Sequence, residues 1–89
     1  MNSVKIVYCS QCGWLPRSAW MAQELLNTFT DSIDELVLVP SKGGIFEIYV
    51  NEKLTWSRKE KDGFPEIKEL KKLVRDIIDP DKDLGHADY

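Results

Sequence analysis

The 89-residue sequence has few cysteines, and their number and spacing already narrow its class. There are only two, Cys9 and Cys12. A small secreted domain that is stabilised by disulfides has more cysteines, spread along the chain. A bridge between Cys9 and Cys12 would close a loop too short to add much stability through chain entropy. We therefore interpret the pair as a chemical group rather than as part of the architecture.

Long apolar runs and an excess of positive charge are also absent. No stretch approaches the length of a membrane span, and residues 1–8 lack the basic-then-apolar pattern of a signal peptide. The formal net charge of −3 gives no reason to expect nucleic acid or an acidic membrane surface as a partner. These absences predict a cytoplasmic protein that binds neither.

The sequence does have the composition and patterning of one small globular domain. Hydrophobic residues make up 43% and charged residues 30%, which argues against disorder. The order strand, helix, strand, strand, strand, helix predicts an α/β fold with a four-stranded mixed sheet, the outline of a minimal thioredoxin-like domain. We expect this domain over residues 4–78 and a loose polar tail over residues 79–89. Apolar patterns predict strands at 4–8, 36–39, 45–50 and 53–56, and helices at 16–29 and 65–78.

Apolar and aromatic side chains at helical spacing are expected to form much of the core. Trp20 and Trp56 are interpreted as packing residues, and the charged residues 57–63 as an exposed loop. The first helix should bury Ala19, Ala22, Leu25, Leu26 and Phe29. The second should bury Ile67, Leu70, Leu73, Val74, Ile77 and Ile78.

The segment Cys9-Ser10-Gln11-Cys12 lies where the first strand passes into the first helix. The spacing lets the two sulfur atoms meet with little movement of the backbone. The start of the helix supplies free N–H groups and a partial positive charge, and this environment stabilises the thiolate, which is the attacking species. A Cys-x-x-Cys at this place in a cytosolic protein indicates a redox site. We predict Cys9 and Cys12 as the catalytic pair.

Two other interpretations of the cysteines stay open. A zinc site needs about four ligands, and the only other good soft-metal ligand is His86 in the expected tail, so zinc would require a second chain. Two inert cysteines in the core are the other alternative, although a loop that precedes a helix is seldom fully buried. We predict no metal site and no bound cofactor, and we assign His86 no role.

Residues near the pair have both a functional and a plain interpretation. We assign Ser10, Gln11, Gly13 and Trp14 to the redox loop. Trp14 either forms an apolar docking surface beside the disulfide or simply caps the core. Gly43 and Gly44 either let their loop approach and face the cysteine pair, as glycines permit, or form a plain turn.

Three segments together resemble the selenoprotein W-like (Rdx) family. The cysteine motif alone is unspecific, but its combination with the other two is specific, and the likeness runs from about Val4 to Ile78. The resemblance implies a thioredoxin-like fold with the element order given above and a redox role. The segments are Tyr-Cys-Ser-Gln-Cys-Gly-Trp at 8–14, Ser-Lys-Gly-Gly-Ile-Phe-Glu-Ile at 41–48 and Asp-Gly-Phe-Pro-Glu at 62–66.

The resemblance also bears on which cysteine attacks. Animal members of the family have selenocysteine at the position of Cys12, and this sequence is similar to the all-cysteine, bacterial-type members. That implies attack by Cys12 and resolution by Cys9, and the proximity of Cys12 to the coming helix favours the same order. In ordinary thioredoxins the first cysteine attacks, so the reverse order stays the alternative.

The main hypothesis is therefore a small thiol–disulfide redox protein that acts in cell redox homeostasis. Its partners would be protein thiols or disulfides, and glutathione or a thioredoxin system would be its thiol donor. The alternative is a redox-sensitive protein-binding module, in which the loop around Trp14 changes its affinity for a partner and turnover is negligible.

Overall fold

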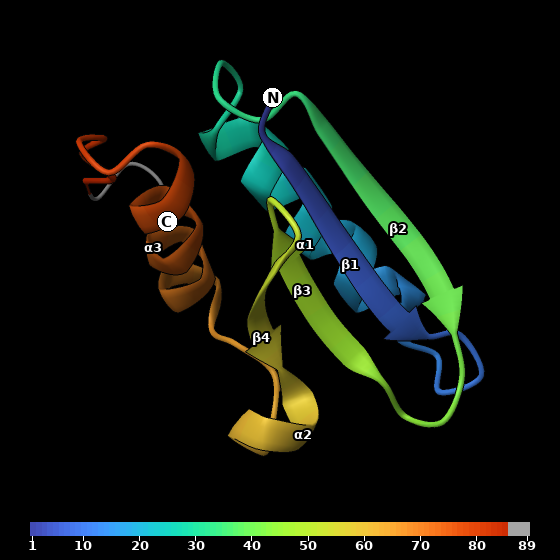
Figure 1. The fold of residues 1–89 in the computed structure, drawn as a ribbon. Coiled ribbons are helices and arrows are strands. Elements are labelled where there is room, and N and C mark those ends of the chain that lie inside the picture. The colour runs from blue at the N-terminus through green and yellow to red at the C-terminus, as the bar shows by residue number, and fades with distance from the viewer. Residues whose placement is uncertain (86–89) are drawn as a thin grey trace.

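The computed structural model describes residues 1–85 and has the expected order of elements with one additional helix (Figure 1). In chain order the elements are β1 (Ser3–Cys9), α1 (Leu15–Thr28), β2 (Glu35–Ser41), β3 (Phe46–Val50), β4 (Lys53–Ser57), α2 (Arg58–Lys61) and α3 (Ile67–Ile78). His86, to which we assigned no role, lies outside the described residues.

The four strands form one mixed sheet in the order β2-β1-β3-β4. β1 and β2 are parallel and pair from Ser3 with Glu35 to Cys9 with Ser41. β1 and β3 are antiparallel, and β3 and β4 form a hairpin. The sheet confirms the predicted four-stranded mixed sheet. These pairings bring four strand termini to the same end of the sheet, which we call the cysteine end. They are the end of β1, the end of β2, the start of β3 and the end of β4.

The core lies between the sheet and the two long helices. Alternate residues of β1 and β3 are fully buried, with Val4, Ile6, Ile48 and Val50 at 0% exposure, because successive strand residues point to opposite faces. α1 packs against β1, β2 and α3 (Figure 1). Helix α3 contributes Leu70 and Val74 to the same cluster.

The expected buried face of α1 is only partly right. Ala22 and Leu25 are buried, but Ala19 is exposed and Leu26 is 44% exposed. Ser18 and Met21 are buried in their place. A helix that packs on a sheet buries one face, and packing selects the face that includes Ser18, Met21 and Leu25 and leaves Leu26 exposed.

The interpretation of the two tryptophans is right for one and wrong for the other. Trp56 is 7% exposed, and its indole Nε1 donates a hydrogen bond to the Gly63 carbonyl at 2.9 Å. Trp20 is 48% exposed, because it lies on the solvent side of α1.

The segment that we expected to be an exposed loop contains the short helix α2. The Ser57 Oγ accepts a hydrogen bond from the Glu60 N–H, which caps the start of the helix. Asp62 ends it with a left-handed backbone, φ 58°. The loop prediction is therefore wrong for Arg58–Lys61, because these local capping signals outweigh the charge run.

The expected tail is not loose throughout. Leu84 lies within it, yet its side chain is 4% exposed and belongs to the hydrophobic core. Leu84 thus anchors the described part of this mostly polar segment. Within residues 1–85, no helix is long and apolar enough to cross a membrane.

Candidate functional site

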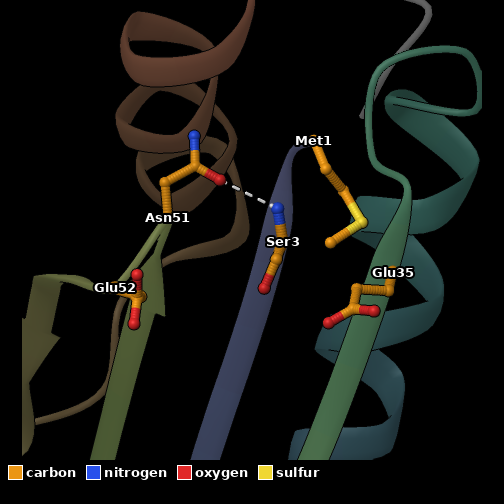
Figure 2. Close-up of a pocket in the computed structure, with 5 residues that line it drawn as sticks. All are labelled: Met1, Ser3, Glu35, Asn51 and Glu52. Carbon is orange, nitrogen blue, oxygen red and sulfur yellow. Dashed lines mark hydrogen bonds between the residues drawn. The ribbon is translucent and has the colours of Figure 1, made fainter.

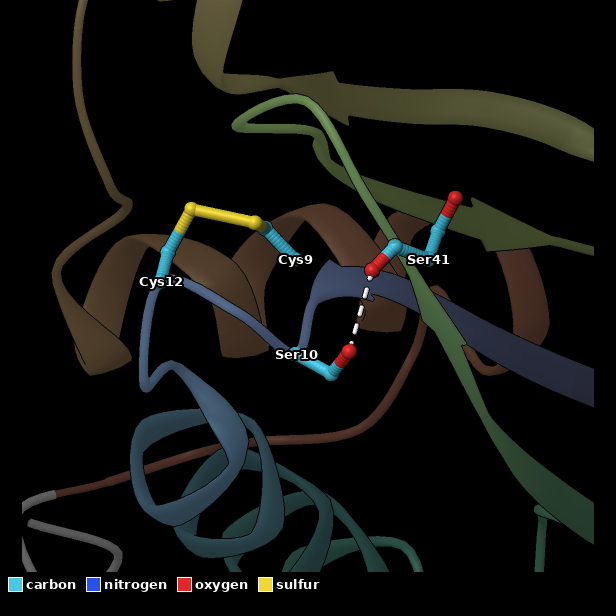
Figure 3. The surroundings of a disulfide bond; sticks show 4 residues. All are labelled: Cys9, Ser10, Cys12 and Ser41. Atoms are coloured by element: carbon cyan, nitrogen blue, oxygen red, sulfur yellow. Dashed lines mark hydrogen bonds between the residues drawn. A yellow bond between two sulfur atoms is a disulfide. The ribbon is translucent and has the colours of Figure 1, made fainter.

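The cysteine pair lies at the junction of β1 and α1. Cys9 is the last residue of β1, and α1 begins at Leu15. The two cysteines form a disulfide, and their Cα atoms are 5.3 Å apart (Figure 3). That separation is within the range that a disulfide can bridge without backbone movement. The pair is therefore placed where the sequence predicted it.

Backbone hydrogen bonds fix the loop between the cysteines. The Ser10 N–H donates to the Ser41 carbonyl at 3.0 Å, and the Ser10 Oγ donates to the same oxygen at 3.2 Å (Figure 3). The Gly13 N–H closes a turn onto the Ser10 carbonyl at 3.1 Å. Gly13 has φ 76°, a conformation that glycine adopts without strain. Gln11 is exposed. The loop is thus attached to the end of β2 on one side and leads into α1 on the other.

The two sulfur-bearing residues differ sharply in exposure. Cys9 is 1% exposed because it ends a central strand, whereas Cys12 is exposed on the loop. A large partner can therefore approach Cys12 but not Cys9 without a change in the loop. This difference was not predictable from the Cys-x-x-Cys spacing, which treats both positions alike.

The start of α1 lies directly after Cys12 and Gly13. Its N-cap residue is Trp14, which makes no side-chain capping hydrogen bond. The first turn of the helix has no acidic residue. The partial positive charge of the helix start is therefore not neutralised by the helix itself, and it favours negative charge in the preceding loop.

An aromatic row extends from this loop across the cysteine end. The ring of Trp14 meets that of Phe64 edge to face, with centroids 5.0 Å apart. Phe64 in turn meets Phe46 at 4.9 Å. Trp14 is only half-buried and packs against the core. Trp14 thus packs against the core while part of it stays at the surface, and its role as a docking surface stays a prediction.

Two arginines lie over this aromatic row. The Arg17 Cζ is 4.0 Å from the centroid of the Phe64 ring. The Arg58 Cζ is 4.9 Å from the Trp14 ring centroid and 5.8 Å from that of Phe64. The sequence did not predict Phe64, Arg17 or Arg58 as site residues, because Phe64 and Arg58 reach Trp14, and Arg17 reaches Phe64, only through the tertiary fold.

Ser41 is a further residue that the sequence did not single out. Its carbonyl holds the redox loop, and its position follows from the parallel register of β1 and β2. Gly43 and Gly44 both have φ 75° and line a hollow of about 190 Å³ with Phe46, Ser57 and Lys59, among others. The hydrogen bonds to the redox loop come from Ser41. That the two glycines face the cysteine pair stays a prediction.

Metal binding was an alternative role for the cysteines. Among residues 1–85, no group of three or more His, Cys, Asp or Glu side chains is arranged to hold a metal ion.

A parallel β-α-β unit, a hairpin and a Cys-x-x-Cys at the strand-to-helix junction define a thioredoxin-like protein. The chain belongs to the Rdx family, whose family model matches residues 3–76. This confirms the resemblance drawn from the three sequence segments. No curated protein matches the sequence.

Two solved structures are close to this one. One is a selenoprotein W-related protein from Vibrio cholerae, 51% identical, with a TM-score of 0.86 over 88% of this chain and 98% of the other. The second is a protein from Bordetella parapertussis, 52% identical, with a TM-score of 0.82 over 84% of this chain and 95% of the other. The predicted thioredoxin-like fold is confirmed.

Proposed function

We propose that the protein is a small thiol–disulfide redox protein in which Cys12 attacks and Cys9 resolves. The observation that carries the proposal is the opposite exposure of the two bonded residues: Cys9 is 1% exposed, and Cys12 lies on the surface loop. An exposed thiolate can meet a partner's disulfide, and a buried neighbour is protected from competing partners. Membership of the Rdx family supports a redox role.

The reaction begins from the reduced pair. The Cys12 thiolate attacks one sulfur of a partner disulfide, forms a mixed disulfide and releases the other partner sulfur as a thiolate. The Cys9 thiolate then attacks the Cys12 sulfur, closes the Cys9–Cys12 disulfide and releases the second partner thiolate. The partner gains two electrons and the protein loses two. Two equivalents of a thiol such as glutathione, or a thioredoxin system, reverse these steps.

The surroundings of Cys12 suit the attacking role. The start of α1 follows two residues after Gly13, and its first turn has no carboxylate. A thiolate at Cys12 is therefore favoured by the helix start. The hydrogen bonds of Ser10 to the Ser41 carbonyl hold the loop so that the Cys9 and Cys12 sulfurs stay within reach of each other.

Trapping of the mixed disulfide tests the order of attack. A Cys9→Ser variant that is mixed with oxidised glutathione should accumulate protein with one glutathione on Cys12, because no resolving thiol remains. A Cys12→Ser variant should react at least about tenfold more slowly, since its single thiol is buried. Mass spectrometry of the intact protein after an acid quench measures both. Faster glutathionylation of the Cys12→Ser variant would reverse the assignment.

A redox-sensitive binding module is the second candidate function. The half-buried Trp14, two residues after Cys12, favours it, because a change in the loop would alter the exposed ring. The two functions differ in turnover. If both cysteine variants support the same rate of disulfide reduction as the unaltered protein, the oxidoreductase proposal fails. The cytoplasm, where thiols are kept reduced, is the compartment that we propose for either function.

A further inference from the structure

Two arginine side chains lie over aromatic rings at the cysteine end. Arg17 comes from the first turn of α1, Arg58 from the start of α2, and both lie over the ring of Phe64, at 4.0 Å and 5.8 Å from its centroid. Arg58 also lies 4.9 Å from the centroid of the Trp14 ring. We call these four residues, Trp14, Arg17, Arg58 and Phe64, the cationic cluster. It begins two residues after Cys12.

Neither arginine of the cluster forms an ion pair within residues 1–85. The two ion pairs of that part of the chain lie elsewhere, between Lys71 and Glu24 and between Arg75 and Asp76. Two like charges held over one ring repel each other, and the chain as a whole has a formal net charge of −3. An acidic protein has many carboxylates that could neutralise such a pair, so leaving both arginines unpaired beside Cys12 points to an external anion.

The manner in which the guanidinium groups are held also suits carboxylate binding. An arginine can stack on an aromatic ring, and the five N–H donors in the plane of its guanidinium then remain available at its edge. Such a group can bind a carboxylate through two parallel hydrogen bonds. Stacking also restricts the long side chain before a partner arrives, which lowers the entropy lost on binding.

We propose that the cationic cluster is the docking surface for an acidic segment of a partner protein. This segment lies next to the partner's own disulfide, which Cys12 attacks. The inference rests on the proposed function, in which Cys12 is the reacting group. The choice of an acidic segment as the occupant rests on charge complementarity with the two arginines. Carboxylates of the segment bind Arg17 and Arg58, and an apolar side chain of the segment contacts the exposed part of Trp14. The partner's disulfide then lies over the redox loop.

Reduction of two matched peptides tests this proposal. Each peptide has one cysteine in a mixed disulfide with 2-mercaptoethanol, flanked by glutamates in one peptide and by lysines in the other. The reduced protein is mixed with each, and closure of the Cys9–Cys12 disulfide is followed by quenching and mass spectrometry. At low salt we expect about a tenfold faster reaction with the acidic peptide, converging toward the basic one in high salt.

Charge-neutralising variants locate the effect. Arg17→Gln and Arg58→Gln should each reduce the preference for the acidic peptide about threefold. Lys53→Gln removes the same charge at the opposite end of the sheet, at the start of β4, and should leave the preference unchanged. Equal rates for the two peptides with the unaltered protein, or an equal loss in the Lys53→Gln variant, would overturn the proposal.

Two further arms separate docking from chemistry. The neutral 2-hydroxyethyl disulfide reports on the cysteines alone, so failure of the protein to reduce it counts against the proposed function and not against docking. Binding is then measured on the oxidised protein with peptides that have serine in place of cysteine, by NMR shifts of the Arg17 and Arg58 Nε–H groups. Stronger shifts with the acidic peptide support docking, and equal shifts refute it.

Oxidised glutathione is the remaining arm, because it is a small anionic disulfide. If Arg58→Gln slows its reduction as much as that of the acidic peptide, the cluster recognises a small anion and the assignment to a protein segment is wrong. A slowing confined to the peptide supports the proposal.

Discussion

The two ends of the sheet differ in how their polar groups are paired. At the end away from the cysteines, Asn2 donates from its backbone N–H to Asp34 at 2.6 Å and from its side chain to the Ser32 carbonyl at 3.0 Å. Asn51 donates to the side chain of Asn2 at 3.0 Å. At the cysteine end, Arg17 and Arg58 lie over rings with no carboxylate of residues 1–85 in ion-pair contact.

The paired groups at the Asn2–Asn51 end stabilise the fold, whereas we propose that the arginines at the cysteine end bind a partner. The Asn2–Asn51 end satisfies its donors within the chain and thereby ties the N-terminus, the hairpin turn and the segment before β2 together. It also contains a hollow of about 340 Å³, where the Asn51 side chain accepts a hydrogen bond from the Ser3 N–H at 2.9 Å (Figure 2). No cysteine is among the residues that line this hollow, so it is not the place of the proposed redox chemistry.

The largest expected effect comes from the centre of the aromatic row. Phe64→Ala removes ring contacts to both Trp14 and Phe46, and we expect it to lower the free energy of unfolding by about 2 kcal/mol, less than for a fully buried phenylalanine. It should also abolish the preference for acidic peptides, since both arginines lose a ring. Urea denaturation measures the stability. Trp20→Ala, at a 48% exposed ring, is the matched control and should change it by less than about 0.5 kcal/mol.

The opposite end should affect stability without affecting redox chemistry. Asn51→Ala removes two side-chain hydrogen bonds at a residue with φ 51° and should lower the free energy of unfolding by about 1.5 kcal/mol. Glu52→Ala alters the neighbouring residue, which has φ 68° but no side-chain hydrogen bond within residues 1–85, and should have a smaller effect. A shift in the redox potential of the cysteine pair in Asn51→Ala would contradict the separation of the two ends.

A smaller effect is expected in the redox loop itself. Ser10→Ala removes the 3.2 Å hydrogen bond from its Oγ to the Ser41 carbonyl but keeps the backbone bond at 3.0 Å. We expect a loss of about 0.5 kcal/mol in the oxidised protein, as for one exposed hydrogen bond. Thermal unfolding of the oxidised and reduced forms would check it. A loss several times larger would mean that the hydroxyl does more than hold the loop.

The smallest effect lies between the two ends. The Tyr49 hydroxyl donates to Glu47 at 2.7 Å, and this bond, with burial and the nearby charge of Glu47, raises the pKa of Tyr49 above its ordinary value. A raised pKa means that the contribution to stability is present at neutral pH and is lost as the pH rises through the pKa of the folded state. Tyr49→Phe should therefore be slightly less stable at pH 7 and lose that difference above pH 10, as measured by denaturation at both pH values.

The sequence predicted the strands and the cysteine pair well because both depend on local patterns. Runs of β-branched residues mark β1, and the turn at Asn51 and Glu52 marks the hairpin. The sequence did not determine which face of α1 is buried, because Leu25 and Leu26 both fit a helical period. Only packing against the sheet decides between them.

The residues around the pair were not predictable in the same way. Phe64 and Arg58 reach Trp14 because β4 runs back to the cysteine end and α2 turns the chain toward α1. Ser41 reaches the redox loop through the parallel register of β1 and β2. Contacts between segments so far apart in the chain are a property of the fold and leave no local signal.

A redox titration of the cysteine pair tests the central claim most directly. The protein is equilibrated in glutathione buffers of graded potential, its thiols are alkylated, and the state of Cys9 and Cys12 is determined by mass. The account predicts a reversible two-electron transition between about −300 and −180 mV, the range of cytosolic and thioredoxin-type couples. Cysteines that stay reduced at every potential would contradict it.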